Sequence, residues 1–177
     1  MCHSKGVNVM YHIGDKVVYG IHGVCTVVDV EERVIDRKRL RYLVLEPLTR
    51  DGSRYFVPVH NAAAMAKLCN MLSKEELSVL MDSKAVRQDC WIRDENIRKQ
   101  TYRELINSGN RVRLMQMVYT LYCHKAAQAE AGRKCHLCDE NFLKDAEKLL
   151  IGEVAVIMGI EPDQAKQYIR NKLKENA

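Results

Sequence analysis

The feature that most constrains this chain is a change of sequence periodicity near residue 65. Before that point, short runs rich in valine and tyrosine alternate with turn-forming residues, which is typical of small antiparallel sheets. After it, apolar residues recur at the three- and four-residue spacing of amphipathic helices. The 177-residue sequence therefore predicts an α+β fold, with a small β-barrel module followed by an all-α helical domain.

Four strands are predicted in the first part of the chain. Each run is short and rich in β-branched or aromatic residues, and Pro47 supports the end of the third one. Turns separate the strands at a spacing of roughly ten residues, and a closed sheet leaves no exposed edge strand. We therefore expect a small barrel, with strands over residues 16–20, 24–30, 41–46 and 54–58.

Capping patterns and glycines divide the second part into five predicted helices. Ser73 and Glu76 match a capping box, in which each side chain accepts a hydrogen bond from the other residue's backbone N–H. Gly109 and Gly159 are typical of helix C-caps. The predicted helices begin at Ser73, Asp94, Asn110, Asp139 and Pro162.

These patterns predict a flexible extension at residues 1–9, a β module at 10–67 and a helical domain at 68–177. No apolar run reaches the roughly 20 residues that a membrane span requires, and no secretory signal is visible. The seven cysteines are odd in number and scattered, which fits reduced thiols better than a disulfide framework. We therefore expect a cytoplasmic protein that makes no membrane contact.

The sequence lacks the short motifs of the common enzyme classes. It contains no Gly-rich phosphate loop, no His-Glu-x-x-His, no Gly-x-Ser-x-Gly and no dinucleotide-binding fingerprint. Two pairs of adjacent carboxylates occur, Glu31–Glu32 and Glu75–Glu76. Neighbouring side chains diverge on a strand or a helix, so neither pair forms a general acid and base. We expect neither enzymatic activity nor a cofactor.

One segment, Cys135–Cys138, has the Cys-x-x-Cys spacing that can supply two thiolates to zinc. Cys123 and His124 are candidate further ligands. A structural zinc site needs four ligands, and no second Cys-x-x-Cys or His-x3-His pair is present. We therefore predict no metal, and a zinc or thiol sensor remains an alternative function.

Positive charge is concentrated in the helical part of the chain. Between Lys84 and Lys134 there are eleven Lys and Arg residues against five Asp and Glu, a balance of +6 where the whole chain has +5. This is the electrostatic footprint of phosphate binding, and a solvated helical surface produces the same pattern. A stand-alone DNA-binding repressor is a further alternative, in which Lys166, Arg170 and Lys172 of the last helix contact DNA.

The single tryptophan, Trp91, lies in this basic region just ahead of a predicted helix. A core tryptophan more often lies inside a periodic apolar stripe. At the edge of an element, an indole can instead wedge against a base step, while Arg93 contacts a phosphate or enters the minor groove. We predict that Trp91 and Arg93 bind DNA.

Four segments together resemble the CarD/CdnL family of bacterial transcription regulators, in order and at the family's spacing from Met10 to Lys174. The segments are Ile13–Tyr19 with His22-Gly-Val24, Tyr42–Leu45 followed by Val57-Pro58, Trp91 with Arg93, and Leu150–Ala155. The resemblance implies a Tudor-like β module that binds the β subunit of RNA polymerase. It also implies a helical domain that contacts promoter DNA with little sequence specificity.

The same resemblance assigns roles to individual residues. Trp91 corresponds to a wedge in the minor groove at the upstream edge of the bubble, where it stabilises the open promoter complex, and Arg93 to a neighbouring DNA contact. Arg33 matches an arginine that contacts the polymerase β subunit. Phe56 occupies the position of a second such arginine, and Arg54, two positions earlier on the same strand face, is the candidate to replace it. Arg33, Arg54 and Phe56 are therefore the predicted polymerase-binding residues.

Overall fold

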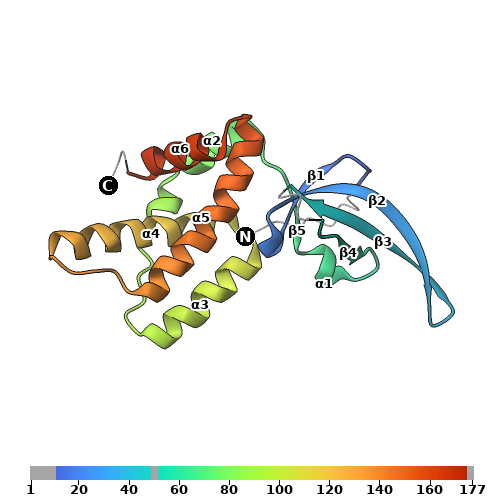
Figure 1. The fold of residues 1–177 in the computed structure, drawn as a ribbon, viewed down its shortest axis with the longest axis horizontal. Coiled ribbons are helices and arrows are strands. Elements are labelled where there is room, and N and C mark those ends of the chain that lie inside the picture. The colour runs from blue at the N-terminus through green and yellow to red at the C-terminus, as the bar shows by residue number, and fades with distance from the viewer. Residues whose placement is uncertain (1–10, 49–51, 175–177) are drawn as a thin grey trace. The chain divides into compact units, whose positions relative to one another are not determined.

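The structure is a computed structural model that describes residues 11–48 and 52–174. The extension predicted at residues 1–9 lies outside these residues. The chain divides into two compact units between Met71 and Leu72, one built mainly from strands and one from helices (Figure 1). The α+β fold class predicted from the sequence is confirmed.

The β unit contains a five-stranded sheet in which all neighbouring strands are antiparallel, in the order β4-β3-β2-β1-β5. A 3-10 turn, η1 (Gly20–His22), follows the first strand. The strands are β1 (Lys16–Tyr19), β2 (Val24–Ile35), β3 (Lys38–Pro47), β4 (Tyr55–Pro58) and β5 (Leu68–Asn70).

One face of the sheet forms the core of the β unit. The register places Val17 opposite Cys25 and Val27 opposite Leu45, so these side chains lie on the same side of the sheet and are buried together. Each buried aliphatic side chain of this kind contributes about 1.5–3 kcal/mol. Among the described strands, β4 and β5 are the two outermost strands of the sheet. Figure 1 shows that β2 and β3 curve strongly along their length.

The hairpin formed by β2 and β3 is longer than the sequence predicts. Asp36 and Arg37 turn the chain with φ angles of 50° and 63°, and Ile35 pairs with Lys38. Positive φ at both central residues is the signature of a type I′ hairpin turn, for which Asn-Gly or Asp-Gly is the usual signal. Most of residues 31–41 are exposed, so no buried alternating face marks these strands in the sequence.

Two short elements of the β unit are absent from the sequence prediction. The helix α1 (Ala62–Met65) is a single turn capped by Asn61, whose side chain accepts hydrogen bonds from the N–H groups of Ala63 and Ala64. Strand β5 pairs with β1, which places residues 68–70 in the sheet, although the sequence assigned them to the helical domain. Three residues are too few for a periodicity to be visible.

The helical unit follows the predicted capping residues closely. Ser73 and Glu76 form the complete capping box, and Gly109 and Gly159 take left-handed conformations at helix ends. The penultimate helix begins before Asp139, with His136 as its N-cap. The helices are α2 (Lys74–Asp82), the 3-10 turn η2 (Lys84–Arg87), α3 (Glu95–Ser108), α4 (Arg111–Glu130), α5 (Leu137–Met158) and α6 (Pro162–Lys174).

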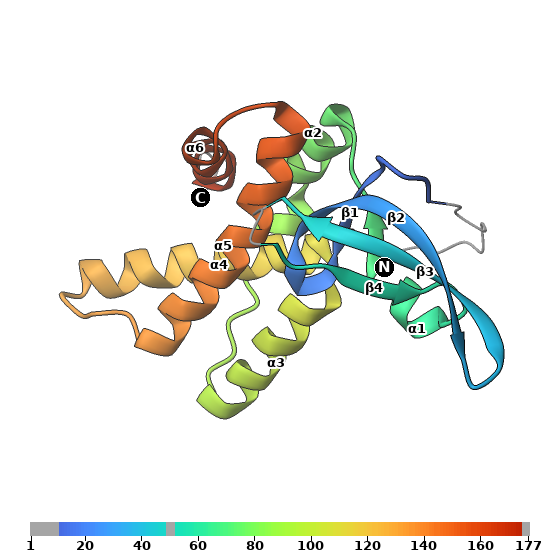
Figure 2. The ribbon, with the colours of Figure 1, turned by 45° about the vertical axis from the view of Figure 1, so that its right-hand side comes forward.

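The core of the helical unit is formed where α4 and α5 pack together. Met117 and Leu121 of α4 and Leu150 of α5 are essentially inaccessible, and Ile169 of α6 joins the same cluster. Figure 2 views α6 nearly along its axis, close to α2 and α5, with which it is in contact. Among the described residues, no helix combines the length and apolarity that crossing a membrane would need.

Candidate functional site

Trp91 lies in the segment of residues 88–94, which connects η2 to α3 without a helix or strand. Its indole is partly buried against the helical core and stacks on the imidazole of His124 from α4. The ring centroids are 3.6 Å apart and the planes differ by 15°. The tryptophan is therefore held at the surface of the helical unit and is neither fully buried nor free.

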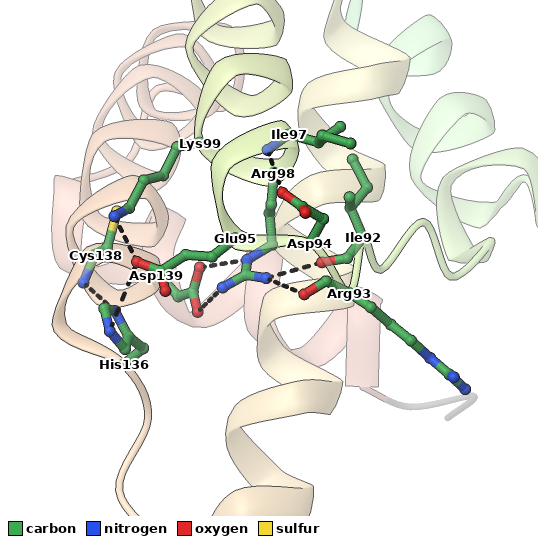
Figure 3. Close-up of polar contacts among 10 residues, drawn as sticks. All are labelled: Ile92, Arg93, Asp94, Glu95, Ile97, Arg98, Lys99, His136, Cys138 and Asp139. Carbon is green, nitrogen blue, oxygen red and sulfur yellow. Dashed lines mark hydrogen bonds and ion pairs between the residues drawn. The ribbon is translucent and has the colours of Figure 1, made fainter.

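Arg98, in the second turn of α3, fastens this segment to two helices. Its Nε and Nη2 atoms donate to the two carboxylate oxygens of Asp139 on α5, at 2.9 and 3.1 Å. Its Nη1 atom donates to the backbone carbonyls of Ile92 and Arg93, at 2.8 and 3.3 Å (Figure 3). The Cζ atom also lies 4.4 Å from the centroid of the Trp91 ring. Arg98 and Asp139 are both buried, with 6% and 2% of their surface exposed.

A second link joins the same two helix starts. Glu95, in the first turn of α3, pairs with Lys99 one turn later and lies 3.8 Å from Nε2 of His136. His136 also accepts a hydrogen bond from the N–H of Cys138, which caps α5 (Figure 3). These partly exposed pairs contribute little individually. The buried Arg98–Asp139 pair therefore carries most of the electrostatic connection between α3 and α5.

The surroundings of His124 change the pKa of its imidazole. Burial lowers the pKa of this imidazole, which favours the neutral ring. Among nearby charges, Asp139 and Asp89 raise the pKa of His124, whereas Arg98 and Arg133 lower it. A neutral imidazole stacked on the indole is consistent with aromatic packing, which contributes about 0.5–1.5 kcal/mol beyond burial.

Arg93 lies next to this cluster and is exposed. Its backbone carbonyl accepts from Arg98, while its side chain extends away from the cluster (Figure 3). Asp94 and Glu95 follow directly, and the Asp94 side chain caps α3 by accepting from the N–H of Ile97. The Arg93 guanidinium is accordingly available to a phosphate, beside two carboxylates that favour the α3 N-terminus.

Arg33 and Phe56, which the sequence predicts to bind polymerase, lie together on the β unit. The Arg33 Cζ atom is 4.0 Å from the centroid of the Phe56 ring and 5.8 Å from that of Tyr42. Arg33 also donates through Nε and Nη2 to one oxygen of Glu31. Phe56 is 39% exposed. We call Arg33, Tyr42 and Phe56 the aromatic–arginine patch.

Arg54 lies just before β4. Among the described residues, it makes no contact with the aromatic rings of this patch. Its Nε atom is 3.7 Å from a carboxylate oxygen of Glu46 on β3, and both side chains are exposed. Such a surface pair is worth roughly 0–1 kcal/mol, so the Arg54 guanidinium can exchange Glu46 for another carboxylate at little cost.

The cysteine-rich segment does not assemble a metal site within residues 11–48 and 52–174. No group of three or more His, Cys, Asp or Glu side chains there has the arrangement to hold a metal ion. His124, a candidate ligand from the sequence, stacks on Trp91 instead, and Cys135 is a free thiol. Burial raises the pKa of the Cys135 thiol, with Asp139 adding to the shift, which lowers its thiolate fraction.

The basic residues of α6 are engaged within the helical unit. Lys166 and Arg170 lie 3.8 and 3.6 Å from the carboxylate of Glu147, which also accepts a hydrogen bond from the hydroxyl of Tyr122. Lys172 pairs with Asp82 of α2 at 2.8 Å. These contacts hold α6 against its neighbours, so its positive charge is partly neutralised internally.

The sequence predicts that Trp91 binds DNA, but it does not indicate which residues hold the indole. The Arg98–Asp139 pair joins positions 41 apart in the sequence, and neither residue belongs to a motif. The sequence indicates His124 only as a candidate zinc ligand, whereas in the structure it stacks on Trp91. Charged and polar residues of this kind are expected on a helix surface, and only the packing of α3, α4 and α5 brings them together.

Comparison with known proteins covers most of the chain. The family model for the CarD-like/TRCF RID domain matches residues 11–69, which span the β unit. The model for the C-terminal domain of CarD matches residues 72–170, which span nearly all of the helical unit. No curated protein matches the chain at a significant level.

Proposed function

This chain belongs to the CarD family of RNA polymerase-interacting transcription regulators, and from that premise we propose that it stabilises the open promoter complex. The β unit binds the polymerase β subunit, and Trp91 enters the minor groove at the upstream edge of the melted DNA. The observation that carries this proposal is the partly exposed indole of Trp91, held in place next to the outward-pointing Arg93.

The aromatic–arginine patch supports the polymerase contact. An arginine stacked on Phe56 and Tyr42 presents one flat, amphipathic surface, and arginine and aromatic side chains are enriched at interfaces. Stacking also limits the conformations of the Arg33 side chain, so less entropy is lost when a partner carboxylate binds it. Phe56, at the position where the family resemblance implies a second arginine, contributes an aromatic ring to this surface.

The two units act together because binding of the β unit to polymerase lowers the DNA affinity that the helical unit needs. Binding to polymerase raises the local concentration of promoter DNA around the helical unit, so a weak DNA contact suffices. The minor groove offers mainly an A·T-versus-G·C code, which agrees with a function at many promoters. Transcription by bacterial RNA polymerase takes place in the cytoplasm, where we place this protein.

Stabilisation of the open complex follows from selective binding. A ligand shifts an equilibrium only by its differential affinity for the two states. If the indole fits only distorted, partly unstacked DNA, its binding energy favours the open state. A difference of about 1.4 kcal/mol changes the ratio of open to closed complexes tenfold at saturation.

The alternatives have less support. A repressor acting through α6 would need free basic side chains, yet Lys166, Arg170 and Lys172 each pair with a carboxylate of the helical unit. A zinc or thiol sensor would need a ligand group or a reactive thiolate, and the described residues contain no such ligand group.

The proposal is tested by the lifetime of open complexes formed with RNA polymerase holoenzyme and the full-length protein. Trp91→Ala is expected to shorten the lifetime towards that without the protein, and Trp91→Phe to retain part of the effect because a ring remains. Both variants are expected to bind polymerase normally. An unchanged lifetime with Trp91→Ala would overturn the wedge.

The polymerase contact is tested separately. Arg33→Glu reverses the charge of the aromatic–arginine patch and is expected to weaken binding to an isolated β-lobe fragment. Arg37→Glu, at the exposed hairpin turn, makes the same charge change outside the patch. Equal affinity of Arg33→Glu and the parent protein would remove the patch from the interface.

A further inference from the structure

We propose that Arg98, held by Asp139, is the positioning residue that fixes the orientation of the Trp91 indole. The inference rests on the proposed function for its role in transcription, but its structural content concerns the helical unit alone. It assigns a role to a buried ion pair that neither the sequence motifs nor the family resemblance single out.

The segment that carries Trp91 needs such an anchor. Residues 88–94 contain no helix or strand, so no regular ladder of hydrogen bonds fixes their backbone. The N–H of Cys90 donates to Thr120 Oγ1 of α4, and the N–H of Trp91 donates to Asp89 within the segment, both at 3.0 Å. These two bonds restrain the backbone up to Trp91, but they do not restrain the residues that follow it.

Arg98 restrains the backbone after the indole. The carbonyls of Ile92 and Arg93, the two residues that follow Trp91, both accept from Nη1 of Arg98. The other edge of the guanidinium is held by both oxygens of Asp139. Because the guanidinium is planar and its donors point in fixed directions, fixing one edge on α5 fixes the direction in which the other edge meets the segment.

The same guanidinium also contacts the indole directly. Its Cζ atom lies 4.4 Å from the Trp91 centroid, and His124 stacks on the ring at 3.6 Å. The indole is thus oriented by side chains from α3 and α4 while remaining partly exposed. A side chain ordered before binding avoids an ordering cost equivalent to roughly two- to tenfold in affinity.

A purely helix-bracing role would not require these contacts. The two bonds from Nε and Nη2 to Asp139 already join α3 to α5. An Arg98 that served only to pair with Asp139 would have no need to bind two loop carbonyls or to lie over the indole. The combination of three targets on one buried side chain points to control of the Trp91 segment.

The test replaces the ion pair without leaving a buried charge. In the double variant Arg98→Met/Asp139→Leu, apolar side chains of similar size fill the space, a replacement that other proteins tolerate. The matched control is Arg111→Met/Glu153→Leu, which removes a buried Arg–carboxylate pair that joins α4 to α5. The two carboxylates, Asp139 and Glu153, are about 20 Å apart along α5. Arg98→Lys, which retains a charge for Asp139, is the second test variant.

Trp91 is the only tryptophan, so fluorescence excited at wavelengths that tyrosine does not absorb reports on its indole alone. We expect acrylamide to quench both Arg98 variants about twofold or more efficiently than the parent, while the control pair matches the parent. With holoenzyme and promoter DNA, the Arg98 variants are expected to shorten the open-complex lifetime about two- to tenfold, and the control is not. If the double variant unfolds, as judged by circular dichroism, Arg98→Lys alone decides the question.

The outcomes separate this inference from the proposed function. Parent-like quenching of folded Arg98 variants overturns the positioning role, whatever happens at promoters. Altered quenching with a parent-like lifetime overturns its relevance to transcription, provided that Trp91→Ala shortens the lifetime. If Trp91→Ala leaves the lifetime unchanged, the wedge itself is wrong, and quenching still decides whether Arg98 positions the indole.

Discussion

The imidazole of His124 stacks on the indole of Trp91, with ring centroids 3.6 Å apart and planes inclined by 15°. This contact joins the segment before α3 to the middle of the core helix α4. It also places a titratable ring against the residue proposed to enter DNA, so protonation of His124 and the stability of this surface are linked.

We predict that the helical unit loses stability as the pH falls below about 6.5, and that His124 contributes to this loss. The folded-state pKa of His124 is lowered mainly by burial, so the unfolded chain takes up its proton first, near pH 6.5. The contribution is fully present above that pH and is lost as the pH falls towards the folded pKa. His124→Phe keeps a stacked ring and is expected to reduce the decline.

Urea unfolding followed by circular dichroism at about pH 7.5 and 5.5 measures this difference. His60→Gln changes an exposed histidine of the β unit, leaves the stack intact and is expected to keep the full decline. An identical pH dependence for His124→Phe and the parent would contradict the prediction.

Phe56→Ala is expected to weaken binding to a polymerase β-lobe fragment about two- to fivefold. Removing the ring takes away the cation–π contact with Arg33, which is worth about 0.5–1 kcal/mol at an exposed site. Phe56→Tyr retains an aromatic ring and is expected to bind like the parent. Titration calorimetry provides the comparison, and equal weakening by both substitutions would show that the ring is not what matters.

Glu147→Gln is expected to lower the free energy of unfolding of the helical unit by about 1–3 kcal/mol. Glu147 is buried and accepts from the Tyr122 hydroxyl while facing Lys166 and Arg170, so the neutral amide loses its attraction to two cations. Glu140→Gln, which affects a more exposed pair with Lys125, serves as the control and is expected to change stability little. Chemical denaturation of the three proteins tests this, and equal stability of Glu147→Gln and the parent would count against it.

Ser73→Ala removes one half of the α2 capping box and is expected to cost about 1 kcal/mol of stability. The Ser73 hydroxyl accepts from the N–H of Glu76 at 3.1 Å, and alanine leaves that N–H without its cap. Ser78→Ala, on the same helix, is expected to change stability by less than about 0.5 kcal/mol. Thermal melting distinguishes the two, and equal shifts would argue against a role for the cap.

Local chemistry explains what could be predicted from the sequence. Ser73, Asp94 and Asn110 each cap a helix through their own side chain, so the starts of α2, α3 and α4 are written into a few neighbouring residues. The position of Trp91 ahead of α3 follows from the same signals. The sequence does not predict the outer part of the β2–β3 hairpin because residues 31–41 have no buried face. Backbone hydrogen bonds pair these strands, and such bonds require no alternation of apolar and polar residues.

The sequence by itself determined the order of the elements, the α+β division and the presence of one tryptophan in a basic helical region. Only the tertiary structure decided how that tryptophan is held, because Arg98, His124 and Asp139 come from three helices that meet through packing. It likewise decided that Arg33 stacks on Phe56, a contact between strands that are not neighbours in the sheet. Contacts between distant residues depend on the geometry of whole elements, and no local pattern records that geometry.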